Sequence, residues 1–169
     1  MGDIVDKITR SRMMAGIRGK DTRPELNLRR ALHRLGLRYR VHATDLPGRP
    51  DIVLPRHRAT ILVHGCFWHR HKGCAFATTP ATNARFWNTK FDQTVERDER
   101  NVAALQHLGW RLAVVWECAL KQKGAEAVAG QIAAWLASDG PFKEIGSENC
   151  EPAKSKKSRR LTPSLKDEF

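Results

Sequence analysis

The segment 64–74, HGCFWHRHKGC, gathers histidines, cysteines and aromatic residues into one irregular stretch without helical or strand periodicity. Cys66, His71 and Cys74 offer three soft ligands from this stretch, and Cys118, just beyond an apolar run, could complete a tetrahedron. Four protein ligands leave no open position, so the pattern predicts a structural zinc ion. The alternative is that these residues are ordinary buried thiols, because cysteine also packs as a small hydrophobe.

Two polar side chains lie at the ends of neighbouring predicted strands. Asp51 begins a strand directly after Pro50, and His64 ends the next strand, so the two can converge on one cleft. A carboxylate is a hard ligand suited to Mg²⁺, while a phosphate of the substrate can supply further oxygens. Taken alone, an aspartate after Pro-Gly-Arg-Pro is also typical of turn chemistry.

Asp98 falls on the apolar stripe of a helix predicted over residues 84–108 and is expected to point at the sheet. A carboxylate there costs several kcal/mol unless it is paired. A histidine is the natural partner, because the carboxylate fixes its tautomer and stabilises its charged form. A salt bridge to Arg40 or Arg49 is the alternative.

Glu25 belongs to a helix start. Thr22-Arg23-Pro24-Glu25 is a capping box with proline in the first turn, and Gly36 ends the predicted helix. This position explains Glu25 without any catalysis, so the local pattern leaves its role open.

Phe67 and Trp68 are adjacent aromatic residues between the predicted zinc ligands. Such side chains either pack or act as wedges that unstack bases in a basic protein. Met13 and Met14, in a basic N-terminal segment, could complement them from the other groove.

The elements that must position these residues alternate between helix and strand. Together they predict an α/β fold, a small mixed sheet flanked by helices. In chain order we expect a helix from residue 22 to 35, strands at 37–42, 51–54 and 59–63, a helix at 84–108, a strand at 111–116 and a helix at 125–137.

The 169 residues carry 30 basic and 18 acidic side chains, a net charge of +12, which fits one domain with charged extensions. Residues 1–50 hold 12 of the basic and 5 of the acidic side chains, which favours a polyanionic partner, above all nucleic acid. A solubility charge is the alternative. No apolar run approaches a membrane span and residues 1–15 lack a secretory pattern, so we expect a soluble intracellular protein.

Three parts are predicted along the chain. They are a basic N-terminal arm at 1–20, a folded domain at 21–141, and a disordered basic tail at 142–169 that carries Cys150 as a free thiol.

Several segments stand in the order found in one family: DT at 21–22, LPGRPD at 46–51, HGCFWH at 64–69, VERD at 95–98, LGWR at 108–111 and VVWEC at 114–118. Over residues 5–121 the chain closely resembles the very-short-patch repair (Vsr) mismatch endonucleases of bacteria. The resemblance implies a restriction-endonuclease-like fold, a variant of the PD-(D/E)XK type with a structural zinc loop. It also implies an enzyme that nicks duplex DNA 5′ to the T of T·G mispairs, left by deamination of 5-methylcytosine, in a Mg²⁺-dependent hydrolysis.

The resemblance also implies roles by position. Asp51 and the backbone carbonyl of Val63 bind Mg²⁺, and His69 with Asp98 handles the attacking water. Supporting catalytic groups are His64 and Glu25, the zinc ligands are Cys66, His71, Cys74 and Cys118, and the wedge that binds DNA is Met14, Phe67 and Trp68.

Two departures from the family pattern affect the zinc loop. Gly73 is an extra residue before Cys74, and Arg70 and Lys72 replace histidines, which leaves His71 as the imidazole ligand.

The partner implied is double-stranded DNA with a T·G mismatch. We expect a monomer in the bacterial cytoplasm, associated with the nucleoid and not with a membrane, with mismatch-repair helper proteins as candidate partners. Two rival functions are a restriction-type endonuclease of the same fold with another DNA target, and a zinc-stabilised DNA-binding module without catalysis.

Overall fold

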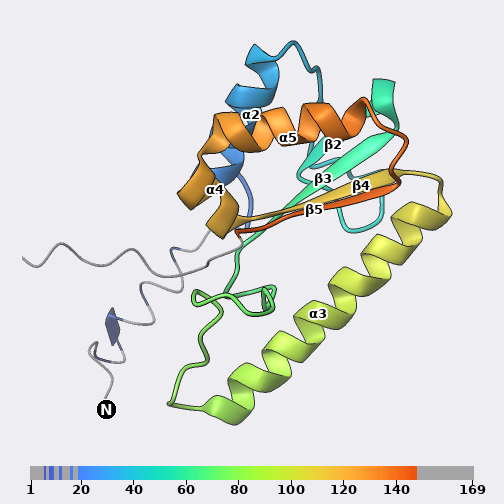
Figure 1. Cartoon of the computed structure of the whole chain (residues 1–169). Coiled ribbons are helices and arrows are strands. Elements are labelled where there is room, and N and C mark those ends of the chain that lie inside the picture. Colours follow the sequence, from blue (N-terminus) through green and yellow to red (C-terminus); the bar gives the residue numbers. More distant parts are fainter. Residues whose placement is uncertain (1–5, 7, 10–11, 13–15, 17–18, 148–169) are drawn as a thin grey trace, which may run out of the picture.

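The chain folds around a five-stranded mixed sheet (Figure 1). The structure is a computed structural model and describes residues 6, 8, 9, 12, 16 and 19–147. The strands lie in sequence order; the first three pair antiparallel, and the third, fourth and fifth pair parallel. They are β1 (Arg40–Val41), β2 (Ile52–Leu54), β3 (Ala59–His64), β4 (Arg111–Trp116) and β5 (Phe142–Ile145).

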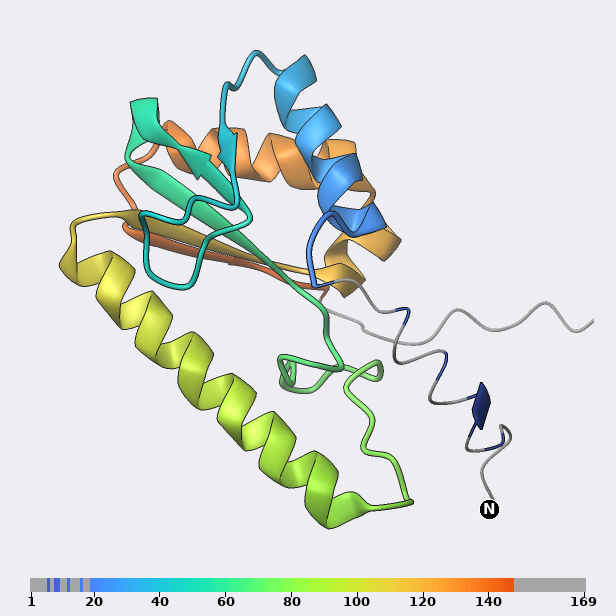
Figure 2. The same cartoon turned by 180° about the vertical axis from the view of Figure 1, so that it is seen from behind.

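Helices cover both faces of this sheet. Helices α2, α4 and α5 lie on one face, and α3 crosses the other, with its N-terminal half projecting past the sheet beside the loop of residues 65–83 (Figures 1 and 2). The helices are α2 (Arg23–Arg34), α3 (Ala84–His107), α4 (Glu117–Lys123) and α5 (Ala125–Leu136), and the 3₁₀ turn η1 (Pro55–His57) joins β2 to β3. No helix in the described part of the chain is both long and apolar enough to span a membrane.

Alternation along the strands builds two apolar layers. Ile61 and Val115 face α2 and α5, whereas Leu62 and Val114 face α3. Strands buried on both faces read as continuous apolar runs, which is why β3 and β4 were predictable from their sequences.

The register of β3 against β4 sets up the functional end of the molecule. His64 pairs with Trp116, so both parallel strands end at the same edge. Cys66 and Cys118 each follow two residues after that pair, and the chain therefore delivers both thiols to one place.

Gly109 fixes the turn from α3 into β4. Its φ of +75° ends the helix, with the N–H of Trp110 donating to the carbonyl of Leu105. Arg58, just before β3, donates to the carbonyls of Leu108 and Gly109 and ties the turn to the sheet.

The predicted mixed sheet flanked by helices is confirmed. The predicted end of the folded domain at residue 141 is wrong, because Phe142–Ile145 pair with β4 as an edge strand. Helix α4 was not predicted. Met13, Met14 and Cys150 lie outside the described residues.

Candidate active site

Asp51 immediately precedes β2 and lies beside Val63, near the end of the neighbouring strand β3. Its Oδ2 accepts a hydrogen bond of 2.7 Å from the N–H of Val63, and Oδ1 has no hydrogen-bond partner in the described part of the chain. Burial raises the pKa of this carboxyl, the Val63 N–H opposes that rise, and the charge of Glu25 adds to it, so that the pKa is about 6. A desolvated carboxylate with an open oxygen beside a backbone strand end is a donor set that fits a divalent cation.

His69 and Asp98 form a hydrogen-bonded pair. The Nδ1 of His69 donates to Oδ2 of Asp98, and Arg97 donates to Oδ1 at 3.3 Å. Burial opposes ionisation of Asp98, but the hydrogen bond and charge of His69 outweigh it and lower the pKa of the carboxyl. With Nδ1 occupied, Nε2 of His69 is the nitrogen that can accept a proton.

The predicted histidine partner of Asp98 is thus confirmed, and the alternative salt bridges are not formed. Arg40 instead pairs with Asp45 at 3.3 Å on the surface.

His64 packs flat against His69, with ring centroids 3.9 Å apart and planes 6° from parallel. Burial first, and then the charge of His69, lower the pKa of His64 to about 3, so its ring is neutral near pH 7. A neutral stacked ring holds the plane of His69 without competing for its proton.

The His69–Asp98 pair opens onto a cavity of about 400 Å³ between α3 and the sheet. This cavity makes the pair accessible to a ligand. The surface that lines the cavity is largely apolar. Its walls include His64, His69, Val95, Asp98, Glu99, Val102, Trp116 and Phe142.

Asp51 and the His69–Asp98 pair are connected through successive residues of β3. Asp51 binds the backbone of Val63, and the next residue, His64, stacks on His69. The end of β3 therefore links the carboxylate of Asp51 to the imidazole that can accept a proton.

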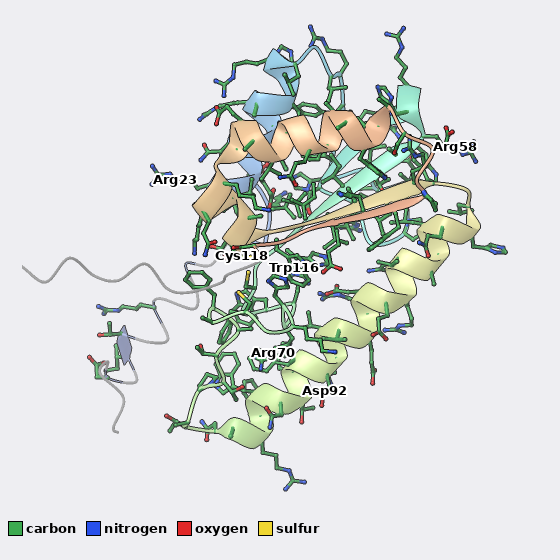
Figure 3. All side chains as sticks on the ribbon, viewed as in Figure 1. Arg23, Arg58, Arg70, Asp92, Trp116 and Cys118 are labelled. Carbon is green, nitrogen blue, oxygen red and sulfur yellow. The ribbon has the colours of Figure 1, made fainter. Side chains whose placement is uncertain are left out.

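Cys66, His71, Cys74 and Cys118 come together next to the end of β3, with their ligand atoms all within 4.8 Å of one another. In Figure 3, Cys118 and Trp116 are labelled where β4 meets the loop. Nδ1 of His71 lies 3.7 Å from the Sγ of Cys66 and 3.4 Å from that of Cys118. A tetrahedral zinc with bonds of ~2.3 Å to sulfur and ~2.1 Å to nitrogen requires about 3.6 Å, so the residues fit this ion.

The neighbours of the cluster also favour a cation. Burial raises the pKa of the Cys66 thiol, so a bound metal is what would keep it as a thiolate. His71 stacks on the ring of Trp116, with 4.1 Å between centroids, and its ring lies so close to Gly146, just after β5, that a Cβ at Gly146 would come within 3.1 Å of it.

The extra Gly73 is accommodated by a tight turn. The N–H of Cys74 donates to the carbonyl of His71 at 3.2 Å, and Gly73 takes a φ of +72° with open space around it. The insertion therefore lengthens the loop without moving Cys74 away from the other ligands.

The aromatic residues of the loop pack against the N-terminal half of α3. The Phe67 ring makes edge contacts with Trp68, Trp87 and Phe91 at centroid distances of 5.1–5.6 Å. Arg70, labelled beside α3 in Figure 3, lies over Phe91. Phe67 and Trp68 are partly exposed, so the packed arrangement keeps them at the surface.

Comparisons with known proteins decide the family. A sequence profile described as DNA mismatch endonuclease Vsr matches residues 2–75. The chain is 42% identical over 151 residues to the DNA mismatch endonuclease Vsr of Escherichia coli, covering 88% of this chain and 96% of that protein. The chain belongs to the Vsr family of DNA mismatch endonucleases.

Other proteins with similar sequences are named type II nicking enzymes. The type II nicking enzyme V.XorIIP of Xanthomonas oryzae pv. oryzae is 46% identical over 125 residues, 74% of this chain and 91% of its own length. V.NmeAIP of Neisseria meningitidis is 40% identical over 123 residues, 73% of this chain and 87% of its own length. Vsr-family membership makes the chain a DNA endonuclease, and a nuclease of this kind uses a divalent metal.

The structure brings most of the site predicted for a Vsr-family enzyme together. Asp51 with Val63, His64 with His69 and Asp98, and the three cysteines with His71 all come into contact as described above. Met14, predicted to bind DNA, lies outside the described residues.

Sequence reasoning missed the partners of Glu25. Arg29, one turn along α2, donates to Oε2 of Glu25 at 3.0 Å and to Asp21 at 2.7 Å, and it lies 2.9 Å from Nε2 of His42. An arginine between Leu28 and Ala31 on the buried face of a helix was the available signal, because such a charge requires a buried partner.

Proposed function

We propose that this protein nicks duplex DNA 5′ to the T of T·G mispairs by Mg²⁺-dependent phosphodiester hydrolysis. The hydrogen-bonded His69–Asp98 pair, linked to the carboxylate of Asp51 through Val63 and His64 of β3, carries the proposal in a chain 42% identical to a DNA mismatch endonuclease. The strand order and the helices on both faces fit the restriction-endonuclease-like fold of this family.

Asp51 and the backbone carbonyl of Val63 would hold Mg²⁺, which when bound polarises the scissile phosphate and activates water. His69 accepts the proton of the attacking water at Nε2 as the water oxygen bonds to phosphorus; the bond from phosphorus to the leaving sugar oxygen breaks, and that oxygen takes a proton from solvent. Asp98 keeps the tautomer that frees Nε2 and stabilises the imidazolium that forms. His64 holds the ring plane, and Glu25 supports the carboxylate side of the site.

Cys66, His71, Cys74 and Cys118 would hold a structural zinc ion. Because His69 lies between the first two of these in sequence, the ion would fix the loop that carries the base.

Phe67 and Trp68, with Met14 from the N-terminal arm, would open the stack at the mismatch. Unstacking costs less where base pairing is already imperfect, which would favour the mismatch over paired DNA. The net charge of +12 favours the DNA backbone as partner. We expect a monomer acting at the bacterial nucleoid, with mismatch-repair helper proteins as further partners.

A panel of duplexes in one Mg²⁺ buffer tests the function. We expect one strand of a T·G duplex to be nicked, and a fully paired duplex of the same sequence to stay intact. Cleavage of both strands of paired DNA would establish a restriction-type enzyme instead. Binding without any cleavage would establish a DNA-binding module.

Replacing Asp98 by asparagine is expected to lower kcat by ~10²–10⁴-fold, because an amide no longer holds the correct tautomer or stabilises the imidazolium. KM for DNA should stay within about twofold, since Asp98 does not need to touch the backbone. Glu96→Gln, an exposed position of the same helix, is the matched control. A change confined to KM would contradict the role of Asp98.

The pKa of Asp51 predicts how cation binding depends on pH. Because that pKa is raised to about 6, the carboxyl is protonated below this pH and loses its cation-binding form. At limiting Mg²⁺ the nicking rate should fall about tenfold per pH unit below the pKa. Saturating Mg²⁺ should shift the midpoint to lower pH, because the cation competes with the proton. A midpoint that does not respond to Mg²⁺ would assign the step to another group.

A further inference from the structure

Asp21, Glu25, Arg29 and His42 form a charged cluster beside Asp51, at the start of α2 and just after β1 (the Arg29 cluster). The guanidinium of Arg29 lies between two carboxylates and an imidazole, with contacts of 2.7 Å to Asp21, 3.0 Å to Glu25 and 2.9 Å to His42. Nε2 of His42 also lies 3.2 Å from Oδ1 of Asp21. Every member of the cluster therefore contacts the guanidinium.

The centre of the Arg29 cluster is buried, whereas its outer member is open to solvent. The side chains of Arg29 and Glu25 are 9% and 4% exposed, and that of Asp21 is 46% exposed. The Nε of Arg29 is the only buried side-chain nitrogen or oxygen without a hydrogen-bond partner in the described part of the chain. The unsatisfied Nε costs some stability. The contacts of the guanidinium with the two carboxylates outweigh that cost.

Both oxygens of Glu25 are fixed by this arrangement. Oε2 accepts from the N–H of Asp21 at 2.9 Å and from Arg29, and Oε1 accepts from the hydroxyl of Thr22 at 3.0 Å. The cap therefore differs from an ordinary capping box, because Thr22 bonds the glutamate and makes no cap bond to the helix backbone. Glu25 is locked in one orientation.

The Arg29 cluster is also joined to Asp51. The N–H of His42 donates to the carbonyl of Asp51 at 3.4 Å as the chain leaves β1. The charge of Glu25 raises the pKa of the Asp51 carboxyl, while those of His42 and Arg29 lower it. The guanidinium thus offsets the repulsion between two carboxylates of the site.

Asp21, Glu25 and His42 present ligand atoms within 4.8 Å of one another, a spacing that could hold a metal ion. The guanidinium already contacts all three, so its charge stands where a cation would bind.

We propose that Arg29 is a positioning residue whose guanidinium is the fixed counter-charge of Glu25 and Asp21, and that it restricts divalent cations to Asp51. This inference rests on the proposed function, since it concerns the carboxylates that would serve the nicking reaction. Arg29 acts through Glu25 and touches neither substrate nor cation.

A calorimetric titration of the full-length, zinc-loaded chain with Mn²⁺ tests directly whether Arg29 acts as the counter-charge of Glu25 and Asp21. We expect one bound Mn²⁺ in the unmodified protein, lost in Asp51→Asn. Arg29→Gln should bind a second Mn²⁺, and the double variant Arg29→Gln with Asp21→Asn should lose it again. Arg34→Gln, which removes an exposed ion pair with Glu126 from the same helix, should still bind one. A second Mn²⁺ in the unmodified protein, or only one in a folded Arg29→Gln, would overturn the proposal.

Nicking kinetics test the positioning role. Arg29→Gln should lower kcat by ~10²-fold with KM for DNA unchanged, because Glu25 loses its fixed orientation. Arg29→Lys keeps a positive charge but cannot bridge both carboxylates, so it should bind one Mn²⁺ and recover only part of kcat. The lysine variant also decides the question if Arg29→Gln does not fold, since full activity in it would refute positioning. If the unmodified chain nicks no duplex, the proposed function fails. The Mn²⁺ titration still decides whether Arg29 keeps a second cation from binding to Glu25 and Asp21.

Discussion

Replacing Asp51 by asparagine is expected to reduce nicking of a T·G duplex by ~10³-fold or more. The amide preserves the shape of the side chain and can still accept from the Val63 N–H, but it loses the charge that would hold Mg²⁺. Metal-ion stabilisation of this kind contributes several kcal/mol, and ~4 kcal/mol corresponds to ~10³-fold in rate. Single-turnover nicking at saturating protein measures the effect without a contribution from DNA affinity.

Binding of the mismatched duplex by Asp51→Asn should be undiminished, because removing a negative charge does not weaken contact with phosphates. Asp92→Asn is a matched control, since Asp92 is an exposed acidic residue on α3 (Figure 3). If Asp51→Asn nicks at the rate of the unmodified protein, Asp51 has no part in the mechanism.

Replacing Cys118 by serine is expected to remove zinc and collapse the loop of residues 65–83. A structural zinc contributes an apparent ~10–16 kcal/mol to folding in small domains, far more than this irregular loop can gain from its own packing. Zinc content should fall from about one ion per chain to none, with a lower melting temperature. Nicking should also be lost, because His69 depends on the same loop.

Cys150→Ser is the control for this experiment, since Cys150 is outside the predicted zinc set. It should retain zinc, melting temperature and activity. A folded, active Cys118→Ser protein without zinc would contradict the assignment of the cluster.

The elements that could be predicted from the sequence are those in which burial produces a regular pattern of apolar residues. Strands β3 and β4 are buried on both faces and therefore read as apolar runs. Helix α3 is buried on one face and therefore reads as an apolar stripe. Strand β5 was missed because it is an edge strand with three exposed residues out of four, and its sequence FKEI carries little apolar signal. Helix α4 was missed because its seven residues are too few to show a stripe.

The site was predictable to the extent that its residue types are unusual. Asp98 on an apolar stripe required a partner, and a histidine is the natural one, which the contact with His69 confirms. The place of His42 in the Arg29 cluster could not be predicted, because His42 meets Arg29 and Asp21 only after β1 folds back beside α2. Likewise, the close approach of Gly146 to His71 depends on the missed strand β5.

The shared end of β3 and β4 limits where this loop can change its length over evolution. Between each strand and its cysteine there is a fixed spacer, and a single insertion in either spacer would carry one thiol away from the other. The stretch between His71 and Cys74 obeys no such limit, because a reversing glycine there absorbs the additional residue. Relatives can therefore vary in length within the zinc loop while both spacers keep a constant number of residues.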